Sequence, residues 1–418
     1  MNNDEIKENL LDVRSHETKL LWKQKNFLIL LLGDLLISFG SKVYELVLPL
    51  LIYELTKSSI VMGTMKAVEF LPNLLLAVFI GVLVDRTDRK RFLIYALFIQ
   101  IILLSTLYIS IKSGHKYILL FYIIGFFFMA LFYCYDNAMT SIVKDVIPYN
   151  LLTSANSKFS FISTFIGIIG PAISGFILAL SNLEDGLLIT MLALLGGFIV
   201  FSFLKSQKNQ IEAKKENQSI LEDIKEGWIE LRRNHSLWLI TLIVVFTNAT
   251  SGLFDSMVIF FAEDSFHLNS FQLGLVFSIA GLGGLIGSLS TDYISKKLMF
   301  GKLIGITIFF ISFAYLIMYF ASNIFLIALS LFLEGIFNSI FAICIYTYRQ
   351  ETTPSHLIGR ISGITGAMFM IGVPLSMFGS GWIASIINTK YLFLGAAILN
   401  LLIFIVYRKL SLWNLTKA

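Results

Sequence analysis

The sequence has little charge for its length. Only 14% of its 418 residues are charged, whereas 56% are hydrophobic and the mean hydropathy is +0.80. Soluble domains carry roughly 25% charged residues. A soluble fold of this size has too little interior to cover so much apolar surface, so most of that surface must face lipid. The composition excludes a disordered chain, a coiled coil and a nucleic-acid-binding domain.

Cysteine and histidine are also scarce. The two cysteines, Cys134 and Cys344, both lie inside apolar runs, so neither a disulfide nor a Cys-x-x-Cys metal site is expected. The five histidines are scattered through polar segments. The phosphate-binding pattern G-x-x-x-x-G-K-[ST] is missing, which removes the support for ATP-driven activity. We expect no metal and no cofactor.

Long apolar runs dominate the rest of the sequence. Crossing a hydrocarbon layer of about 30 Å takes roughly 20 apolar helical residues, and helices satisfy their own backbone hydrogen bonds in lipid. The sequence therefore predicts an all-α membrane protein with twelve transmembrane helices. The predicted spans are 27–55, 60–84, 92–112, 117–142, 156–180, 186–204, 237–262, 270–291, 302–320, 324–347, 360–386 and 390–408.

The basic residues predict the orientation of these spans. If both termini are cytoplasmic, 26 of the 32 lysines and arginines fall in inside segments, four in outside loops and two within spans. Such a bias is typical of cytoplasmic loops. We therefore expect a multi-pass protein of the cell membrane with both termini in the cytoplasm, and the excess of positive charge needs no nucleic-acid partner.

A polar segment divides the spans into two sets of six. The charged stretch before the first span predicts a soluble arm and no cleavable signal peptide. The two halves echo each other, because Asp85 precedes Arg89 and Lys90 by the same offsets at which Asp292 precedes two lysines. The predicted parts are an arm (1–26), a six-helix bundle (27–204), a cytoplasmic linker (205–236), a second six-helix bundle (237–408) and a tail (409–418).

The linker contains a helix-like pattern at 219–234. Ser219 and Glu222 form a capping-box pattern, and apolar residues recur after them at helical spacing among charged ones. This predicts an amphipathic helix that lies on the inner membrane surface or on the bundle. A helix that only connects the two halves explains the pattern equally well.

The loop after the second span carries a specific motif. Residues 81–91 read GVLVDRTDRKR, which resembles the G-x-L-a-D-r-x-G-r-k-r signature of the major facilitator superfamily. Asp88 stands where that family usually has glycine. The resemblance implies a secondary transporter of two pseudo-symmetric six-helix bundles, in which this loop latches the halves in one conformation. The residues it assigns to gating are Gly81, Asp85, Arg86, Arg89 and Lys90; charge that only fixes topology is the alternative.

The fifth span carries a second motif. Gly167, Gly170, Pro171 and Gly175 resemble the G-x-x-x-G-P-x-x-G-G motif of the exporter branches of the superfamily, in a shortened form. Ordinary packing of small residues between helices is the alternative. The pattern of the whole chain is similar to the drug/proton antiporters that include macrolide-efflux pumps and enterobactin-type siderophore exporters.

Four charges within the first two spans predict an ion-pair cluster. Each costs roughly 2.5–3.5 kcal/mol near the bilayer centre, so opposite charges are expected to pair. With the two helices antiparallel, Lys42 should lie near Glu69 and Glu45 near Lys66. These pairs would line the cavity, with a structural role favoured over substrate binding.

Four further acids within spans have no opposite charge within one helical turn. Glu334 lies nearest the middle of the membrane, so it is the first candidate for a proton-coupling residue, and Asp255 is the second. Asp136 lies toward the inner end of its span, where pairing with Arg86 or Arg89 of the latch is expected. For Asp34, solvation at the inner surface is as good an explanation.

The sequence thus predicts a proton-coupled exporter that works by alternating access. Aromatic pockets with a few acids suit large amphiphilic cations such as macrolide-type antibiotics. The alternatives are a dedicated exporter of a siderophore or self-made peptide, and a lysolipid flippase. A membrane-embedded enzyme would need a nucleophile and base, or a set of metal ligands, clustered at one depth, and the sequence shows no such cluster. The expected partners are a small-molecule substrate, protons and lipid, and the protein is expected to be a monomer.

Overall fold

The computed structural model describes residues 20–148, 151–205, 220–354 and 357–415, and every regular element within these ranges is a helix. Twelve segments of the described chain are long and apolar enough to cross a membrane, as the sequence predicts. The first six are α2 (Lys25–Thr56), α3 (Ser59–Arg86), α4 (Arg89–Lys112), α5 (Ile118–Val146), α6 (Leu152–Ala179) and α7 (Asp185–Ser202).

The second half repeats this layout with one interruption. Its helices are α9 (His235–Phe266), α10 (Ser270–Ser295), α11 (Phe300–Tyr319), α12 (Ile324–Thr352), α13 (Ile358–Met370), α14 (Gly372–Ile386) and α15 (Thr389–Lys409). The eleventh span is split into α13 and α14 at Ile371. Pro374 explains the break, because a proline inside a helix has no N–H to donate and clashes with the carbonyl four residues earlier, here that of Met370.

Side-chain caps fix where several spans begin. The Asn234 side chain accepts a hydrogen bond from the Leu237 N–H at the start of α9. Asn269 and Gln272 form a reciprocal capping box at the start of α10. These caps satisfy N–H groups that have no partner within the helix. Observed and predicted boundaries accordingly differ by only a few residues.

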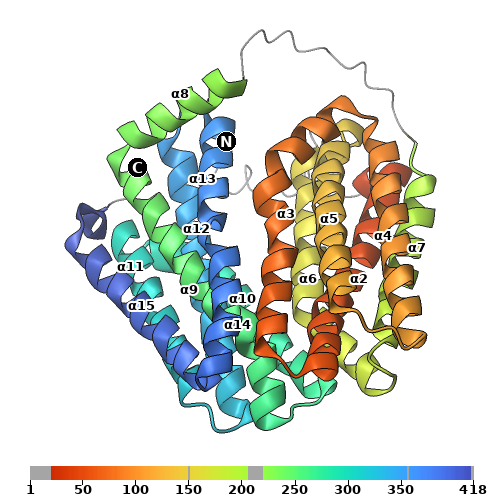
Figure 1. Cartoon of the computed structure of the whole chain (residues 1–418). Helices are drawn as coiled ribbons and strands as arrows, with labels where there is room; N and C mark the ends of the chain where they lie inside the picture. The colour runs from red at the N-terminus through yellow and green to blue at the C-terminus, as the bar shows by residue number, and fades with distance from the viewer. Residues whose placement is uncertain (1–19, 149–150, 206–219, 355–356, 416–418) are drawn as a thin grey trace.

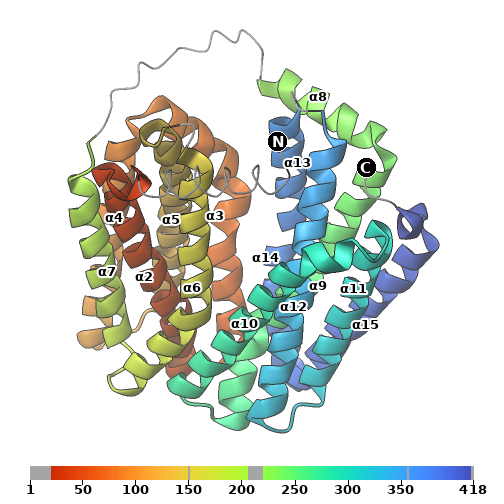
Figure 2. The ribbon, with the colours of Figure 1, turned by 180° about the vertical axis from the view of Figure 1, so that it is seen from behind.

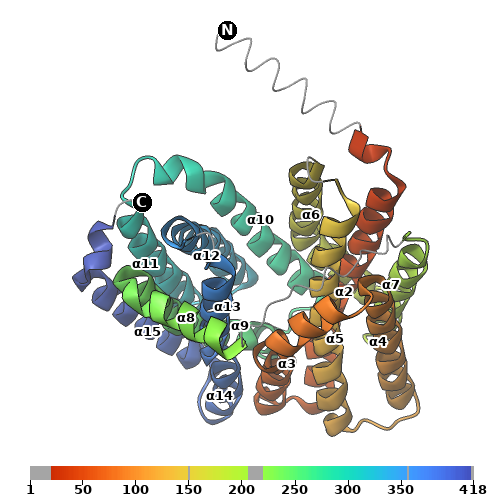
Figure 3. The ribbon, with the colours of Figure 1, turned by 90° about the horizontal axis from the view of Figure 1, so that it is seen from above.

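The two halves stand side by side and touch at one end. Figures 1 and 2 show the ribbons of α2–α7 and of α9–α15 diverging on the side that carries α8 and converging on the opposite side. Seen from above, α10 reaches across to α6 (Figure 3). At the converging side the Tyr53 hydroxyl donates to Asp264 at 3.2 Å, and the Ser59 hydroxyl donates to the Gly381 carbonyl at 2.9 Å.

The linker helix forms as predicted. Helix α8 (Ile220–Arg233) lies across the end of the second half (Figure 3). Its Gly227 and Leu231 are buried, and Glu226 forms an ion pair with Arg360 of α13. Of the two positions predicted for this helix, packing on the bundle is therefore observed. Ser219 of the predicted capping box and residues 1–19 of the arm lie outside the described residues.

Candidate functional site

A polar recess of 690 Å³ opens between three helices of the first half. Its acids are Asp34 on α2 and Asp136 on α5, with Glu45 further along α2. The Tyr135 hydroxyl donates to Asp34 at 3.2 Å. Serine and threonine hydroxyls form much of the remaining polar lining, which also includes Lys42, Lys144 and Asn156. The apolar part comes from Phe132, Met139, Val143, Leu152, Phe159 and Ile166.

Helix geometry brings the two aspartates to one depth. Asp34 lies nine residues after the start of α2, and Asp136 lies ten residues before the end of α5. At 1.5 Å per residue, both are about 14–15 Å from the α8 side. They are close enough to interact electrostatically. The sequence-based predictions do not pair these two aspartates, although the span boundaries already imply their matched depth.

The predicted pairing of Asp136 with Arg89 is not observed, whereas its pairing with Arg86 stays a prediction, because the side-chain surroundings of Arg86 lie outside the described residues. Arg89 forms its ion pair with Asp145 at 2.6 Å, nine residues further along α5. Lys90 donates to the carbonyl oxygens of Ser202 and Leu204 at the end of α7. Asp136 faces the recess and lies nine residues deeper along α5 than Asp145, which is close to the end of the helix. It is therefore too deep to pair with Arg89 at the start of α4.

Three residues of the predicted gating loop cannot be followed in the same way. The side-chain surroundings of Gly81, Asp85 and Arg86 lie outside the described residues. Their gating role stays a prediction from the motif.

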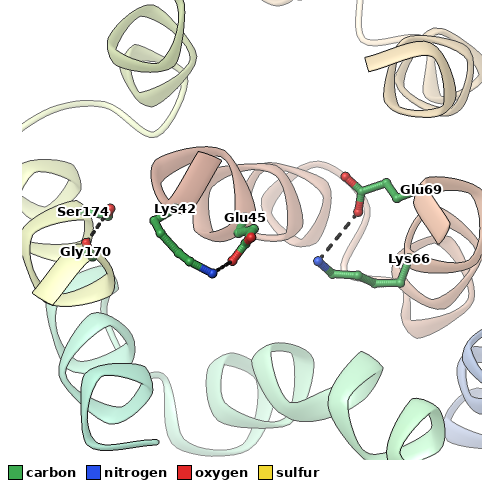
Figure 4. A network of polar contacts seen from close by, with 6 residues as sticks. All are labelled: Lys42, Glu45, Lys66, Glu69, Gly170 and Ser174. Atoms are coloured by element: carbon green, nitrogen blue, oxygen red, sulfur yellow. Dashed lines mark hydrogen bonds and ion pairs between the residues drawn. The ribbon is translucent and has the colours of Figure 1, made fainter. Parts of the chain in front are cut away.

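The four charges of α2 and α3 pair within their own helices. Lys42 contacts Glu45 at 2.6 Å and Lys66 contacts Glu69 at 3.6 Å, as Figure 4 shows. The predicted cross-helix pairs are therefore wrong. Residues three apart on a helix already face each other, so each lysine reaches its own neighbour without crossing to the other helix.

Glycines let α6 approach α2 and α10. A Cβ atom on Gly170 would lie 3.1 Å from the Cγ atom of Lys42, so this glycine leaves room for the lysine beside it. Gly175 faces α10 instead, and α10 also approaches the backbone carbonyl of Gly167. A Cβ on Gly175 would lie 3.0 Å from the Cα of Gly274, and a Cβ on Gly281 would lie 2.7 Å from the Gly167 carbonyl oxygen. Gly167 and Gly175 thus lie at the contact between the halves, whereas Gly170 lies at a contact within the first half.

A second glycine contact joins α3 to α14. A Cβ on Gly63 would lie 2.8 Å from the Cα of Gly381. Together with the α6–α10 contact, it closes the side opposite α8. Gly63 and Gly381 are not among the residues predicted from the sequence, because neither lies in a recognisable motif and only their contact with each other identifies them.

The two acids predicted for proton coupling are neighbours in the second half. Asp255 of α9 and Glu334 of α12 are close enough to interact electrostatically. Lys66, from the first half, interacts with Asp255. Tyr315 of α11 is buried beside both acids and its hydroxyl lies 2.9 Å from the Ser251 hydroxyl. Sequence reasoning missed Lys66 and Tyr315 as members of this cluster.

The described residues contain no group of three or more His, Cys, Asp or Glu side chains placed to hold a metal ion. The described residues instead combine a polar recess, interacting acids and glycine contacts between two halves, on a frame of twelve candidate membrane spans. These features define a membrane transporter.

Comparison with known proteins gives the family. The sequence profile of the Major Facilitator Superfamily matches residues 30–364 and 301–413, so the chain belongs to this superfamily. It is a transporter and not an enzyme.

Two sequence relatives cover nearly the whole chain. Macrolide efflux protein A of Streptococcus pyogenes is 22% identical over 410 residues, which cover 92% of this chain and 95% of the relative. The uncharacterized MFS-type transporter YkuC of Bacillus subtilis is 22% identical over 406 residues, which cover 93% of this chain and 92% of the relative.

Solved structures confirm the fold. The nucleoside transporter NupG superposes with a TM-score of 0.74 at 14% identity, covering 93% of this chain and 100% of that one. A bacterial homologue of the human lysosomal transporter Spinster, in an inward-facing and unoccupied conformation, superposes with a TM-score of 0.72 at 13% identity. The superposition covers 92% of this chain and 96% of the homologue. At these identities, the likeness extends to the fold alone.

Proposed function

We propose that the protein is a secondary active exporter that exchanges protons for hydrophobic or amphiphilic small molecules such as macrolide-type antibiotics. The observation that carries this proposal is the electrostatic interaction between Asp255 of α9 and Glu334 of α12. Two interacting carboxylates repel each other when both are ionised, and uptake of one proton removes the repulsion. The proton gradient would supply the energy.

The orientation follows from the basic residues. The α8 side carries the loops rich in lysine and arginine, which favours its location in the cytoplasm. The halves touch on the other side, through Gly63 with Gly381 and Gly175 with Gly274. The conformation is then open toward the cytoplasm. Separation of these glycine contacts, together with closure of the two halves on the α8 side, would open the substrate recess toward the outside.

The recess supports an amphiphilic substrate. Its aromatic and aliphatic lining suits an apolar body, and Asp34 and Asp136 suit a protonated amine. A volume of 690 Å³ lies within the range of small-molecule sites. The likeness to macrolide efflux protein A over nearly the full chain favours export of such compounds.

The test is transport in inverted membrane vesicles. An inside-acidic gradient should drive uptake of a radiolabelled macrolide by the wild type. Glu334→Gln should abolish this uptake while leaving equilibrium binding of the compound within about threefold. Glu351→Gln, at the exposed end of the same helix, is the matched control and should transport normally. Gradient-driven uptake by Glu334→Gln at the wild-type rate would remove Glu334 from the coupling mechanism.

A further inference from the structure

Helix α8 presents an exposed stripe of unusual composition. Ile224, Trp228 and Arg232 follow one another at intervals of four residues, which places them on one side of the helix. Ile224 is 45% exposed and Trp228 is 41% exposed. Gly227 and Leu231, which hold the helix against the bundle, are buried. The stripe is therefore left uncovered by the described chain.

The first turn of a spanning helix extends this stripe. Trp228 lies edge-on against Trp238 of α9, with ring centroids 5.5 Å apart. The Arg232 guanidinium lies over the Trp238 ring, 4.5 Å from its centroid. Helix α9 begins at His235, so Trp238 marks the level at which the chain enters the membrane. Tryptophan is enriched at this boundary because its ring is apolar and its N–H is polar.

The charge on the stripe is positive. The described chain gives Arg232 no carboxylate partner, although ion pairs are recorded for the neighbouring Arg233 and Glu226. A guanidinium stacked on an indole keeps its N–H groups available in its own plane, where they match the oxygens of a phosphate. Glu226 and Glu230 point away from this side, since Glu226 reaches α13 and both line a separate recess.

We propose that the lipid stripe, defined as Ile224, Trp228, Arg232 and Trp238, binds an anionic phospholipid of the leaflet next to α8. Helix α8 slopes toward the spans from its first residue to its last (Figure 1), so Arg232 takes the headgroup phosphate and Trp238 lies against the upper acyl chains. Ile224 and Trp228 then lie at the level of the headgroups. A cation stacked on an interfacial tryptophan, beside two further exposed apolar side chains, matches the charge and polarity of an anionic phospholipid at the membrane surface.

Such a lipid would act on the transport machinery through α13. A Cβ atom on Gly227 would lie 2.8 Å from the Cδ1 atom of Ile364 and 3.1 Å from the Cβ atom of Arg360, so this glycine lets α8 pack closely against α13. The Glu226–Arg360 ion pair fastens the same contact. A lipid that holds α8 to the membrane surface therefore also holds α13, which forms the first part of the split eleventh span.

Tryptophan quenching in nanodiscs tests the proposal without any transport assay. Replacing Trp22, Trp382 and Trp413 with phenylalanine leaves fluorescence from Trp228 and Trp238 only. Nanodiscs contain equal amounts of phosphatidylglycerol and phosphatidylcholine, with bromine high on the acyl chains of one lipid or the other. Brominated phosphatidylglycerol should quench at least twofold more than brominated phosphatidylcholine.

The variants separate lipid selectivity from folding. Arg232→Gln should remove the preference, Arg232→Lys should keep part of it, and Arg233→Gln should leave it unchanged, because Arg233 points away from the stripe. Equal quenching by the two lipids in the parent protein would overturn the anionic site. Strong quenching by aqueous iodide with none from either lipid would overturn membrane contact altogether.

Discussion

The hydroxyl oxygen of Ser278 in α10 accepts a hydrogen bond from the backbone N–H of Ala172 in α6, at 3.0 Å across the contact between the two halves. Ala172 follows Pro171, which has no N–H and so leaves the Gly167 carbonyl without its helical partner. Gly281 of α10 approaches that same carbonyl. Helix α10 therefore contacts the backbone of α6 where the proline interrupts its hydrogen bonds.

Replacing Ser278 with alanine should shift the conformational equilibrium. A hydrogen bond made in only one state contributes about 1 kcal/mol, which is about a fivefold change in population. Spin labels at the exposed Leu180 and Ile386 should report longer distances in Ser278→Ala. Ser288→Ala is the control, since Ser288 bonds only within its own helix. An unchanged distance distribution in Ser278→Ala would show that this bond does not bias the equilibrium.

Gly381→Ala should hinder closure of the α3–α14 contact. The added Cβ would lie 2.6 Å from the Ser59 carbonyl oxygen, and the backbone there can yield only if the helices separate. Overpacking of this kind costs about 1–3 kcal/mol, so the closed population and the transport rate should both fall severalfold. Gly379→Ala is the matched control, because its Cβ would meet no atom within 4 Å. Equal transport by both variants would contradict this role of the contact.

Asp255 and Glu334 should behave as one unit in proton exchange. Addition of substrate to purified wild-type protein should release protons into a weakly buffered solution, as measured with a pH indicator. Because the two acids interact, the effects of replacing each of them on proton release should be non-additive. The double variant Asp255→Asn with Glu334→Gln should release no fewer protons than Glu334→Gln alone. If the fraction of proton release that remains in the double variant is the product of the fractions that remain in the two single variants, the acids act independently.

Stability at the loop before α7 should depend on pH. A hydrogen bond from Lys112 lowers the pKa of Glu184 below its ordinary value of 4.5. The ionised pair therefore stabilises the fold above about pH 4.5, and this contribution disappears as the pH falls through the lowered pKa of Glu184. Thermal unfolding in detergent should show Glu184→Gln less stable than the wild type at pH 7 and equal to it near pH 3. A constant difference between the two pH values would contradict the assignment.

Several parts of the site could be predicted from the sequence because they depend on position along one helix. Asp255 and Glu334 stand out as charges inside apolar runs, where any ionisable group is costly. Pro171 and its glycines form a recognisable local pattern. The partner of Arg89 could not be predicted, because Asp136 and Asp145 lie on the same helix and only the depth at which α4 begins selects between them.

The sequence by itself determined the twelve spans, their division into two halves and the position of the linker helix. These features follow from the length of each apolar run and from caps that act within a few residues. Only the tertiary structure decided that Lys42 and Lys66 pair within their own helices, that Gly63 meets Gly381, and that Asp34 shares a recess with Asp136. Contacts between helices depend on how each helix is rotated and how deeply it lies, and neither quantity is encoded in the hydropathy of a single run.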